Sequence, residues 1–437
     1  MATGKASRAS QVRIELPYGS ERLHLTIPQE NLLAIAEPAE ATPVADPAAA
    51  LLEAVRAPVG SAPLRELVRP GSRVLVIIDD NTRPTPQHQI LPALLAEMEA
   101  AAPGIEIRLL IAAGTHRPMT TEEIQRKVGP EVAARYTILN HDWADEKQLV
   151  DMGTTPNGTP IKVNRLVTEA DLVVAVGATV PHCLAGWGGG AKIIQPGVCG
   201  EDTTNATHAL NMISPVPHLG RLDNPMRQEI EEIVKLAPLR FMVNAVLDRH
   251  GQIVHLVAGE PRLSHRRSVE RAEAIWMVPV PALADIVVVS SHPADIDYWQ
   301  GIKGLFAAEL IVKRGGDVIL ATPCPEGIAG NPEHVRSMAA LAGLPSKAMR
   351  HEAARRGIKD LAGVNSAVVA ARINELAWVS VYSHGLTDEH LRILGHERAT
   401  TIEEGLQRAF ARQGPQARVL VITHGGDICP VLASKPA

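Results

Sequence analysis

The chain is poor in aromatic residues and in cysteine, and neither sign of charge dominates it. Aromatics make up 3% of the 437 residues, and the four cysteines, Cys183, Cys199, Cys324 and Cys429, form no CxxC pair. This cysteine spacing indicates neither a disulfide framework nor a structural zinc site. The 43 Lys and Arg residues against 48 Asp and Glu residues leave a net charge of -5, which is not the basic footprint of a nucleic-acid-binding protein.

Long apolar runs are also missing. No run approaches the roughly 18 residues that a membrane-spanning helix needs. The first residues, Met-Ala-Thr-Gly-Lys, lack the apolar core of a signal peptide. We therefore expect a cytoplasmic protein with neither a membrane nor a nucleic acid as a partner.

Aliphatic residues are abundant and occur in short continuous runs. Runs at residues 73–78, 105–112 and 171–177, and later at 284–290, 317–321, 378–382 and 418–423, are typical of buried parallel strands. Helical patterns follow at 89–102, at 120–128, where Thr120 or Thr121 can cap ahead of two glutamates, and at 268–277. This alternation predicts an α/β fold.

The length of the chain predicts more than one domain, because 437 residues are too many for one hydrophobic core. We expect two α/β domains with mainly parallel sheets and an active-site cleft between them. The predicted N-terminal domain, residues 1–275, contains most of the chemically active residues. The predicted C-terminal domain, residues 276–437, would close the cleft.

Two of the expected strands end in turns with reactive side chains. The sequence DDNTRP follows the first run, and AGTHRP follows the second. Ligands of open α/β sheets bind at this edge. Arg83 suits bidentate capture of a substrate carboxylate, although a capped turn with a local Asp–Arg pair explains it equally well. His116 alone is as readily a turn residue that forms hydrogen bonds as a general base.

The third strand leads into the most unusual segment. His182, Lys192 and His208 lie within 27 residues, around the glycine turn GWGGG at 186–190. The segment combines a proton acceptor, an amine and a metal-type ligand with backbone that can approach a ligand closely.

Two common glycine motifs do not fit this segment. A P-loop needs Gly-Lys followed by Ser or Thr, whereas Ala191 precedes Lys192 and Ile193 follows it. The spacing also differs from a dinucleotide-binding fingerprint. On chemistry alone, Lys192 is a phosphate contact or a surface residue more often than a site of covalent attachment.

Five motifs together resemble the nickel-pincer lactate racemase family. That family has a D-x-T-R-P strand end, a G-T-H-R turn, a histidine with a lysine ten residues later, a second histidine sixteen residues after that lysine, and a Q-x-x-K element. Here they occur in order, with the spacings kept, at 80–84, 114–117, His182, Lys192, His208 and 300–303. Their joint occurrence is highly specific.

The resemblance implies a cofactor bound by the N-terminal domain. It is the nickel-pincer nucleotide, pyridinium-3,5-bisthiocarboxylic acid mononucleotide, covalently bound to Lys192 and holding Ni(II) through sulfur, carbon and sulfur. His208 is implied as the fourth ligand, in the square-planar geometry that Ni(II) favours. Gly188, Gly189 and Gly190 would admit the cofactor, whose phosphate would meet backbone amides there. Enzymes that synthesise the cofactor and insert nickel are the implied partners.

The remaining motif residues would act on the substrate. The resemblance implies that Arg83, Gln300 and Lys303 hold the substrate carboxylate. Asp80, grouped with the cofactor-binding residues, would orient a neighbouring catalytic side chain.

The implied reaction is racemisation or epimerisation of a small-molecule 2-hydroxy acid such as lactate. The hydrogen on C2 is weakly acidic, because the adjacent carboxylate stabilises a carbanion poorly, and its removal as hydride avoids that carbanion. A 2-keto acid is the intermediate. His116 and His182 suit mirrored acid and base roles on its two faces.

Three residues depart from the family pattern, namely Cys183, Trp187 and Trp299. They are either ordinary packing residues or residues that reshape the pocket. Lactate is therefore one candidate substrate beside malate, longer 2-hydroxy acids and sugar acids.

Two functions of other classes stay open. A metal-dependent hydrolase or lyase could use His116, His182 and His208 around zinc, but it would leave Lys192 without a task. A non-catalytic nickel or nucleotide carrier would leave His116 and His182 without one.

Overall fold

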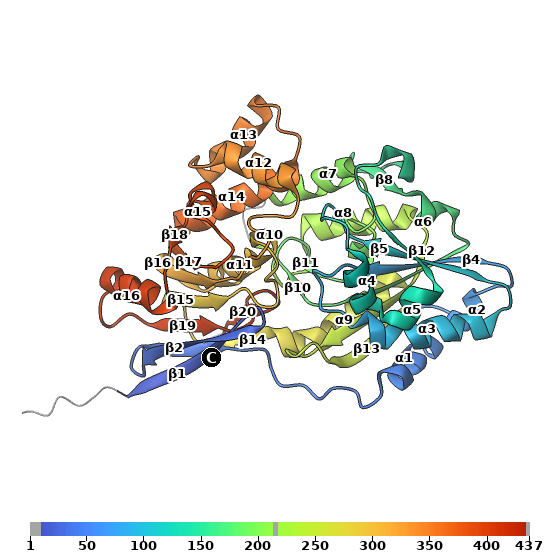
Figure 1. The fold of residues 1–437 in the computed structure, drawn as a ribbon, viewed down its shortest axis with the longest axis horizontal. Coiled ribbons are helices and arrows are strands. Elements are labelled where there is room, and N and C mark those ends of the chain that lie inside the picture. The colour runs from blue at the N-terminus through green and yellow to red at the C-terminus, as the bar shows by residue number, and fades with distance from the viewer. Residues whose placement is uncertain (1–9, 213–216, 434–437) are drawn as a thin grey trace, which may run out of the picture.

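The first half of the molecule is built on a six-stranded sheet. The computed structural model describes residues 10–212 and 217–433 (Figure 1). The strand order of this sheet is β13-β12-β9-β4-β5-β6, and only the β12–β13 pair is antiparallel. The bounds are β4 (Arg73–Asp79), β5 (Glu106–Ala112), β6 (Thr137–Asn140), β9 (Leu172–Ala178), β12 (Leu239–Leu247) and β13 (Ile253–Gly259).

A second six-stranded sheet, entirely parallel, forms the other half. Its order is β18-β17-β16-β15-β19-β3. The bounds are β3 (Leu32–Ala36), β15 (Ala284–Ser290), β16 (Val312–Ala321), β17 (Trp378–Tyr382), β18 (Glu397–Arg398) and β19 (Val419–Ile422). The predicted α/β class with mainly parallel sheets is confirmed.

Helices flank both sheets. In the first half they are α1 (Pro47–Arg56), α2 (Leu64–Leu67), α3 (Gln87–Ala101), α4 (Thr121–Val128), α5 (Pro130–Arg135), α6 (Arg165–Glu169), α7 (Glu201–Met212), α8 (Pro225–Leu236) and α9 (Pro261–Trp276). In the second half they are α10 (Tyr298–Gly301), α11 (Lys303–Glu309), α12 (Pro332–Leu341), α13 (Ser346–Arg355), α14 (Leu361–Leu376), α15 (Asp388–Leu394) and α16 (Ile402–Gln413). Over the described residues, none of these helices is long and apolar enough to cross a membrane.

Alternate residues of each central strand enter different cores, which explains why the strands are unbroken apolar runs. In β4, Val76 packs in the core under α1 and α3, whereas Ile77 packs in the core on the opposite face, with α6 and α8. In β15, Val287 joins the core with α11, α12 and α14, and Val288 joins the core with α16. Both faces of each sheet are therefore covered.

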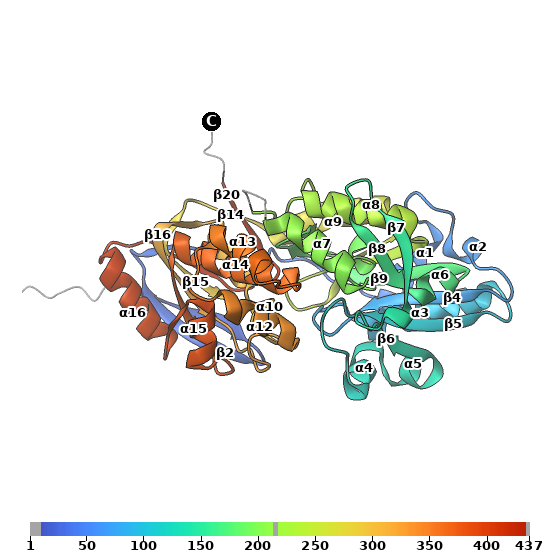
Figure 2. The same ribbon diagram turned by 90° about the horizontal axis from the view of Figure 1, so that it is seen from above.

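The N-terminal strands belong with the second sheet. The hairpin β1 (Gln11–Tyr18) and β2 (Glu21–Pro28) shares a core with β15, β16 and β19, and Figures 1 and 2 both place it beside this half. Strand β3 pairs with β19. The division near residue 275 stays a prediction, and a division in space would assign residues 11–36 to the second half.

Most expected elements occur within a few residues of their predicted bounds. Two elements begin earlier than expected: α9 begins at Pro261 rather than at 268, and β16 begins at Val312 rather than at 317. In β16 the first residues, including two glycines, break the apolar run. At the start of α4 the structure decides between the two possible caps. The Thr120 hydroxyl accepts from the Glu123 N–H, and the Glu123 carboxylate accepts from the Thr120 N–H at 2.8 Å, which forms a capping box.

This capping box gives a stability prediction. Thr120→Ala should lower the free energy of unfolding by about 1 kcal/mol, because one N–H at the start of α4 loses its acceptor. Thr121→Ala, at an exposed neighbouring position, is the matched control and should change stability much less. Urea denaturation followed by circular dichroism measures both, and equal losses in the two variants would contradict the assignment of the cap.

Candidate active site

A cavity of about 120 Å³ lies where the two halves meet. Its floor is formed by the turns after β4, β5 and β9, which are neighbours in the first sheet. Residues of α10, α11 and α14 border it from the second half. Every side chain predicted from the motifs lines this cavity: Asp80, Arg83, His116, His182, Lys192, His208, Gln300 and Lys303.

The three glycines of the turn have different roles. Gly188 and Gly189 border the cavity, and Gly190 does not. The N–H groups of Gly188 and Gly190 donate to Val180 O and Asn244 Oδ1, at 2.7 and 3.1 Å, so they are not free to bind a phosphate. Gly190 has φ +58° and faces the His265 ring, which a Cβ would meet at 2.5 Å. The absence of a side chain at Gly190 lets its backbone pack against the His265 ring.

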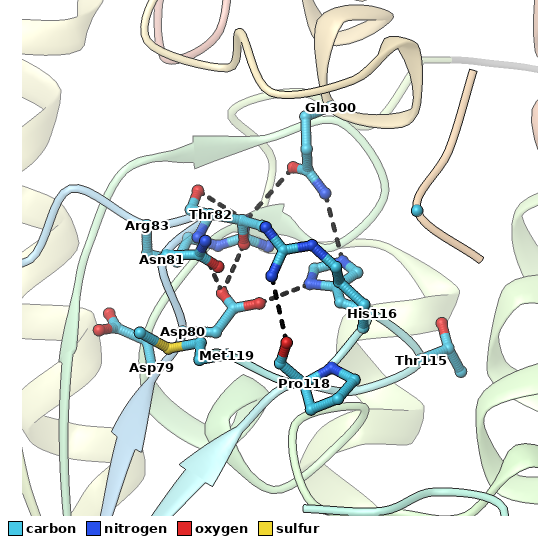
Figure 3. A network of polar contacts seen from close by, with 12 residues as sticks. Asp79, Asp80, Asn81, Thr82, Arg83, Thr115, His116, Pro118, Met119 and Gln300 are labelled. Carbon is cyan, nitrogen blue, oxygen red and sulfur yellow. Dashed lines mark hydrogen bonds and ion pairs between the residues drawn. The ribbon is translucent and has the colours of Figure 1, made fainter. Parts of the chain in front are cut away.

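A network of polar contacts surrounds His116 (Figure 3). The Asp80 Oδ2 lies 2.7 Å from His116 Nδ1, and Thr82 donates to Asp80 Oδ1 at 2.5 Å. On the other side of the ring, Gln300 Nε2 lies 3.2 Å from His116 Nε2, and Gln300 Oε1 accepts from Arg83 at 3.4 Å. Gln300, from the second half, therefore contacts both His116 and Arg83 of the first half.

The charge of Asp80 determines the tautomer of His116. Burial alone would raise the pKa of Asp80, but His116, Arg83 and Thr82 outweigh it and hold that pKa well below its usual range. An ionised carboxylate only accepts hydrogen bonds, so the proton of neutral His116 lies on Nδ1. The Nε2 lone pair then faces Gln300 and the cavity.

His182 has the opposite tautomer. Its Nδ1 accepts from the N–H groups of Leu184 and Ala185, at 3.2 and 3.3 Å, so the proton of the neutral ring lies on Nε2. Burial, with repulsion from Lys192 and Lys303, holds the pKa of His182 well below its usual value. The two predicted catalytic histidines therefore differ at rest, one with an acceptor and one with a donor at Nε2.

The Lys192 amine has a pKa well below its usual value. Loss of solvent lowers its pKa most, and repulsion from Arg83, Lys303 and Arg227 lowers it further, to well below the usual value. It lies at the 3₁₀ turn Gly190–Ile193. A lowered pKa favours the unprotonated amine, which retains its lone pair and is the nucleophilic form.

His208 lies on α7, and a hydrogen bond within this helix orients its ring. Its Nδ1 donates to the Thr204 carbonyl at 2.8 Å, which leaves the Nε2 lone pair free. Burial lowers the pKa of His208 to about 4, although the Thr204 carbonyl opposes this shift. The ring is therefore neutral near pH 7 and able to ligate a metal ion.

A zinc centre built from the three histidines has no counterpart here. In the part of the chain that the structure describes, no three His, Cys, Asp or Glu side chains are grouped closely enough to hold a metal ion. The three histidines line one cavity without converging on one point.

The three unusual residues divide between packing and the cavity. Trp187 is fully buried outside the cavity and donates to Gly220 O at 3.0 Å, so it is a packing residue. Cys183 and Trp299 both line the cavity. Burial raises the pKa of the Cys183 thiol, which therefore stays protonated.

Sequence reasoning missed several residues near the cavity. Arg227 is buried and donates to Ala185 O at 3.1 Å and to Trp187 O, so it holds the glycine turn. His334 and Asp360 form a buried pair behind Trp299. No motif marks these residues, because their neighbours in space come from distant parts of the chain.

Comparison with known proteins identifies the family. The lactate racemase N-terminal domain matches residues 18–220, and the lactate racemase C-terminal domain matches residues 280–429. The chain is 30% identical to a lactate racemase of Lactiplantibacillus plantarum, over 95% of this chain and 98% of that protein. It is 32% identical to a lactate racemase of Thermoanaerobacterium thermosaccharolyticum, over 72% of this chain and 76% of that protein.

Two solved structures are similar to this chain. The lactate racemase apoprotein from Thermoanaerobacterium thermosaccharolyticum superposes with a TM-score of 0.87, at 28% identity, over 96% of this chain and all of that chain. A Thermotoga maritima protein has a TM-score of 0.69 at 18% identity, over 89% of this chain and 97% of that chain, which shows a shared fold alone. The resemblance predicted from the five motifs is confirmed, and this chain belongs to the lactate racemase family.

Proposed function

We propose that this protein racemises or epimerises a 2-hydroxy acid and carries a nickel-pincer nucleotide on Lys192. One observation carries the proposal. The Lys192 amine, whose pKa is lowered, and the free His208 Nε2 border the same cavity as the His116–Asp80 pair and the cationic side chains of Arg83 and Lys303. A non-catalytic carrier would need the first two residues but not the others.

The residues present fit the cofactor. Lys192 would hold it covalently through Nζ, which the low pKa keeps nucleophilic. His208 would supply a neutral imidazole nitrogen, a ligand that suits Ni(II). When bound, the cofactor supplies an acceptor and donor of hydride for C2 of the substrate. Enzymes for its synthesis and for nickel insertion would act before this protein.

Substrate binding would rest on a cationic pair and an amide. The hydrogen bonds of Arg83 go to Thr82 and Gln300, both neutral, so its charge is available for a carboxylate. Lys303 lies at the start of α11 on the other side of the cavity. Anchors from both halves would bring the carboxylate to the junction between them.

His116 and His182 would handle the hydroxyl proton. His116 Nε2 has the lone pair that a base requires, and Asp80 would stabilise the imidazolium that forms. His182 begins with its proton on Nε2, where it can donate to the hydroxyl or keto oxygen. To act as a base, His182 would have to move that proton to Nδ1, away from the Leu184 and Ala185 N–H groups.

The covalent attachment can be tested by mass. Lys192→Arg should show no added mass after co-expression with the cofactor-synthesis enzymes, and no racemisation, because a guanidinium is not a nucleophile. His208→Ala should keep the added mass but lose nickel. Lys147→Arg, at an exposed position, is the control and should match the unaltered protein. Intact mass spectrometry and metal analysis give the readouts, and an active chain without added mass would refute the proposal.

Lys303 gives a pH prediction. Burial and repulsion from Arg83 lower its pKa to about 8, against the opposing effect of Asp427. The ammonium is therefore charged below pH 8 and is lost above it, so kcat/KM should fall by up to about tenfold between pH 7 and pH 9. Lys303→Arg keeps its charge in this range and should lack this fall. The same fall in both proteins would assign it to another group.

Single-turnover assays with each pure enantiomer can distinguish the roles of His116 and His182. His116→Ala and His182→Ala should each lose racemisation by about 10²–10⁴-fold, the usual contribution of a general base. Each variant should still oxidise the enantiomer that the remaining histidine serves, so their residual preferences should be opposite. His88→Ala removes an exposed histidine of α3 and is the control. Equal residual rates on both enantiomers would contradict the two-histidine assignment.

A further inference from the structure

A buried Asp–His pair lies directly behind the wall of the cavity. His334, on α12, places Nδ1 at 3.0 Å from both carboxylate oxygens of Asp360, the residue that caps α14. The side chains are 5% and 3% exposed. Burial alone would raise the pKa of Asp360, but the hydrogen bond from His334 holds it below its usual value. None of the proposed chemistry uses this pair.

The ring of His334 is stacked on Trp299. The ring centroids are 4.0 Å apart and the planes differ by 7°. Because the imidazole covers one face of the indole and is itself fixed by Asp360, the indole cannot rotate without breaking this stack. Trp299 directly precedes Gln300, which contacts both His116 and Arg83.

The same histidine also meets the first half of the molecule. His334 Nε2 lies 3.3 Å from the Thr115 hydroxyl, and Asn331 Nδ2 donates to the Thr115 carbonyl at 3.4 Å. Thr115 precedes His116, and both Thr115 and Trp299 line the cavity. The Trp299 side chain is therefore held at a set distance from the proposed catalytic histidine.

We propose that Trp299 is the specificity-determining residue of the cavity, selecting substrates by the size of the group on C3, and that His334, held by Asp360, is the residue that positions it. The inference rests on the proposed function. The carboxylate would be held by Arg83, Gln300 and Lys303, and C2 would face the catalytic histidines. A rigid indole beside Gln300 then limits the space left for the rest of the substrate.

The size limit is tested with a series of 2-hydroxy acids of increasing bulk at C3, from lactate through 2-hydroxybutyrate to 4-methyl-2-hydroxypentanoate and phenyllactate. Trp299→Ala should shift the ratio of kcat/KM for the largest against the smallest acid by about tenfold or more toward the largest, since one methylene in a pocket changes selectivity by about 10–200-fold. Trp299→Phe should shift it less. A parallel change for all acids would overturn the role of Trp299.

Two variants of His334 separate stacking from hydrogen bonding. His334→Phe keeps a flat ring against Trp299 but loses the hydrogen bond to Asp360, so its size preference should shift less than that of Trp299→Ala. His334→Gln keeps polar contacts to Asp360 and Thr115 but removes the ring, so its preference should shift in the same direction as that of Trp299→Ala. The reverse pattern, or no shift in His334→Gln, would overturn the positioning role.

Binding distinguishes this inference from the proposed function. The same acids are titrated calorimetrically into the loaded protein and into Trp299→Ala. If no acid is turned over but the size preference in binding shifts, the proposed reaction is wrong and the selection by Trp299 stands. If turnover occurs and neither preference shifts, the reaction stands and the selection is wrong.

Discussion

The bridge that Gln300 makes between His116 and Arg83 is the contact on which the site depends. It joins the turns of β4 and β5, in the first half, to α10 in the second. The orientation of the amide is consistent with its neighbours, since Oε1 faces the Arg83 donors and Nε2 faces the His116 lone pair. Through this contact, one residue of the second half meets both the proposed carboxylate anchor and the proposed proton acceptor of the first half.

Electrostatics explains how one cavity holds so many basic groups. Burial lowers the pKa of Lys192 most, and Arg83, Lys303 and Arg227 repel a further charge there. Burial is also the main cause that lowers the pKa values of His182 and His208. The cations that would attract a carboxylate therefore also favour the unprotonated form of Lys192 that attachment requires.

The residues predicted from the sequence line one cavity, because several of them follow strands whose order in the sheet brings their ends together. Asp80, His116 and His182 could be placed at neighbouring strand ends from apolar runs alone, and the family spacing added Lys192, His208 and Lys303. The role of Gly190 and the pairing of β3 with β19 could not be predicted, because each depends on a distant partner, His265 and the second sheet. The same reason hid His334 and Asp360.

Retention of isotope at C2 tests the proposed reaction most directly. The cofactor-bound protein racemises a single enantiomer of a 2-hydroxy acid, deuterated at C2, in ordinary water. The opposite enantiomer is then isolated, and its mass is measured by mass spectrometry. Hydride transfer within one cavity predicts that the product keeps its deuterium. Replacement of that deuterium by hydrogen from water would show that C2 loses a proton, and it would contradict the account given for His116, His182 and Lys192.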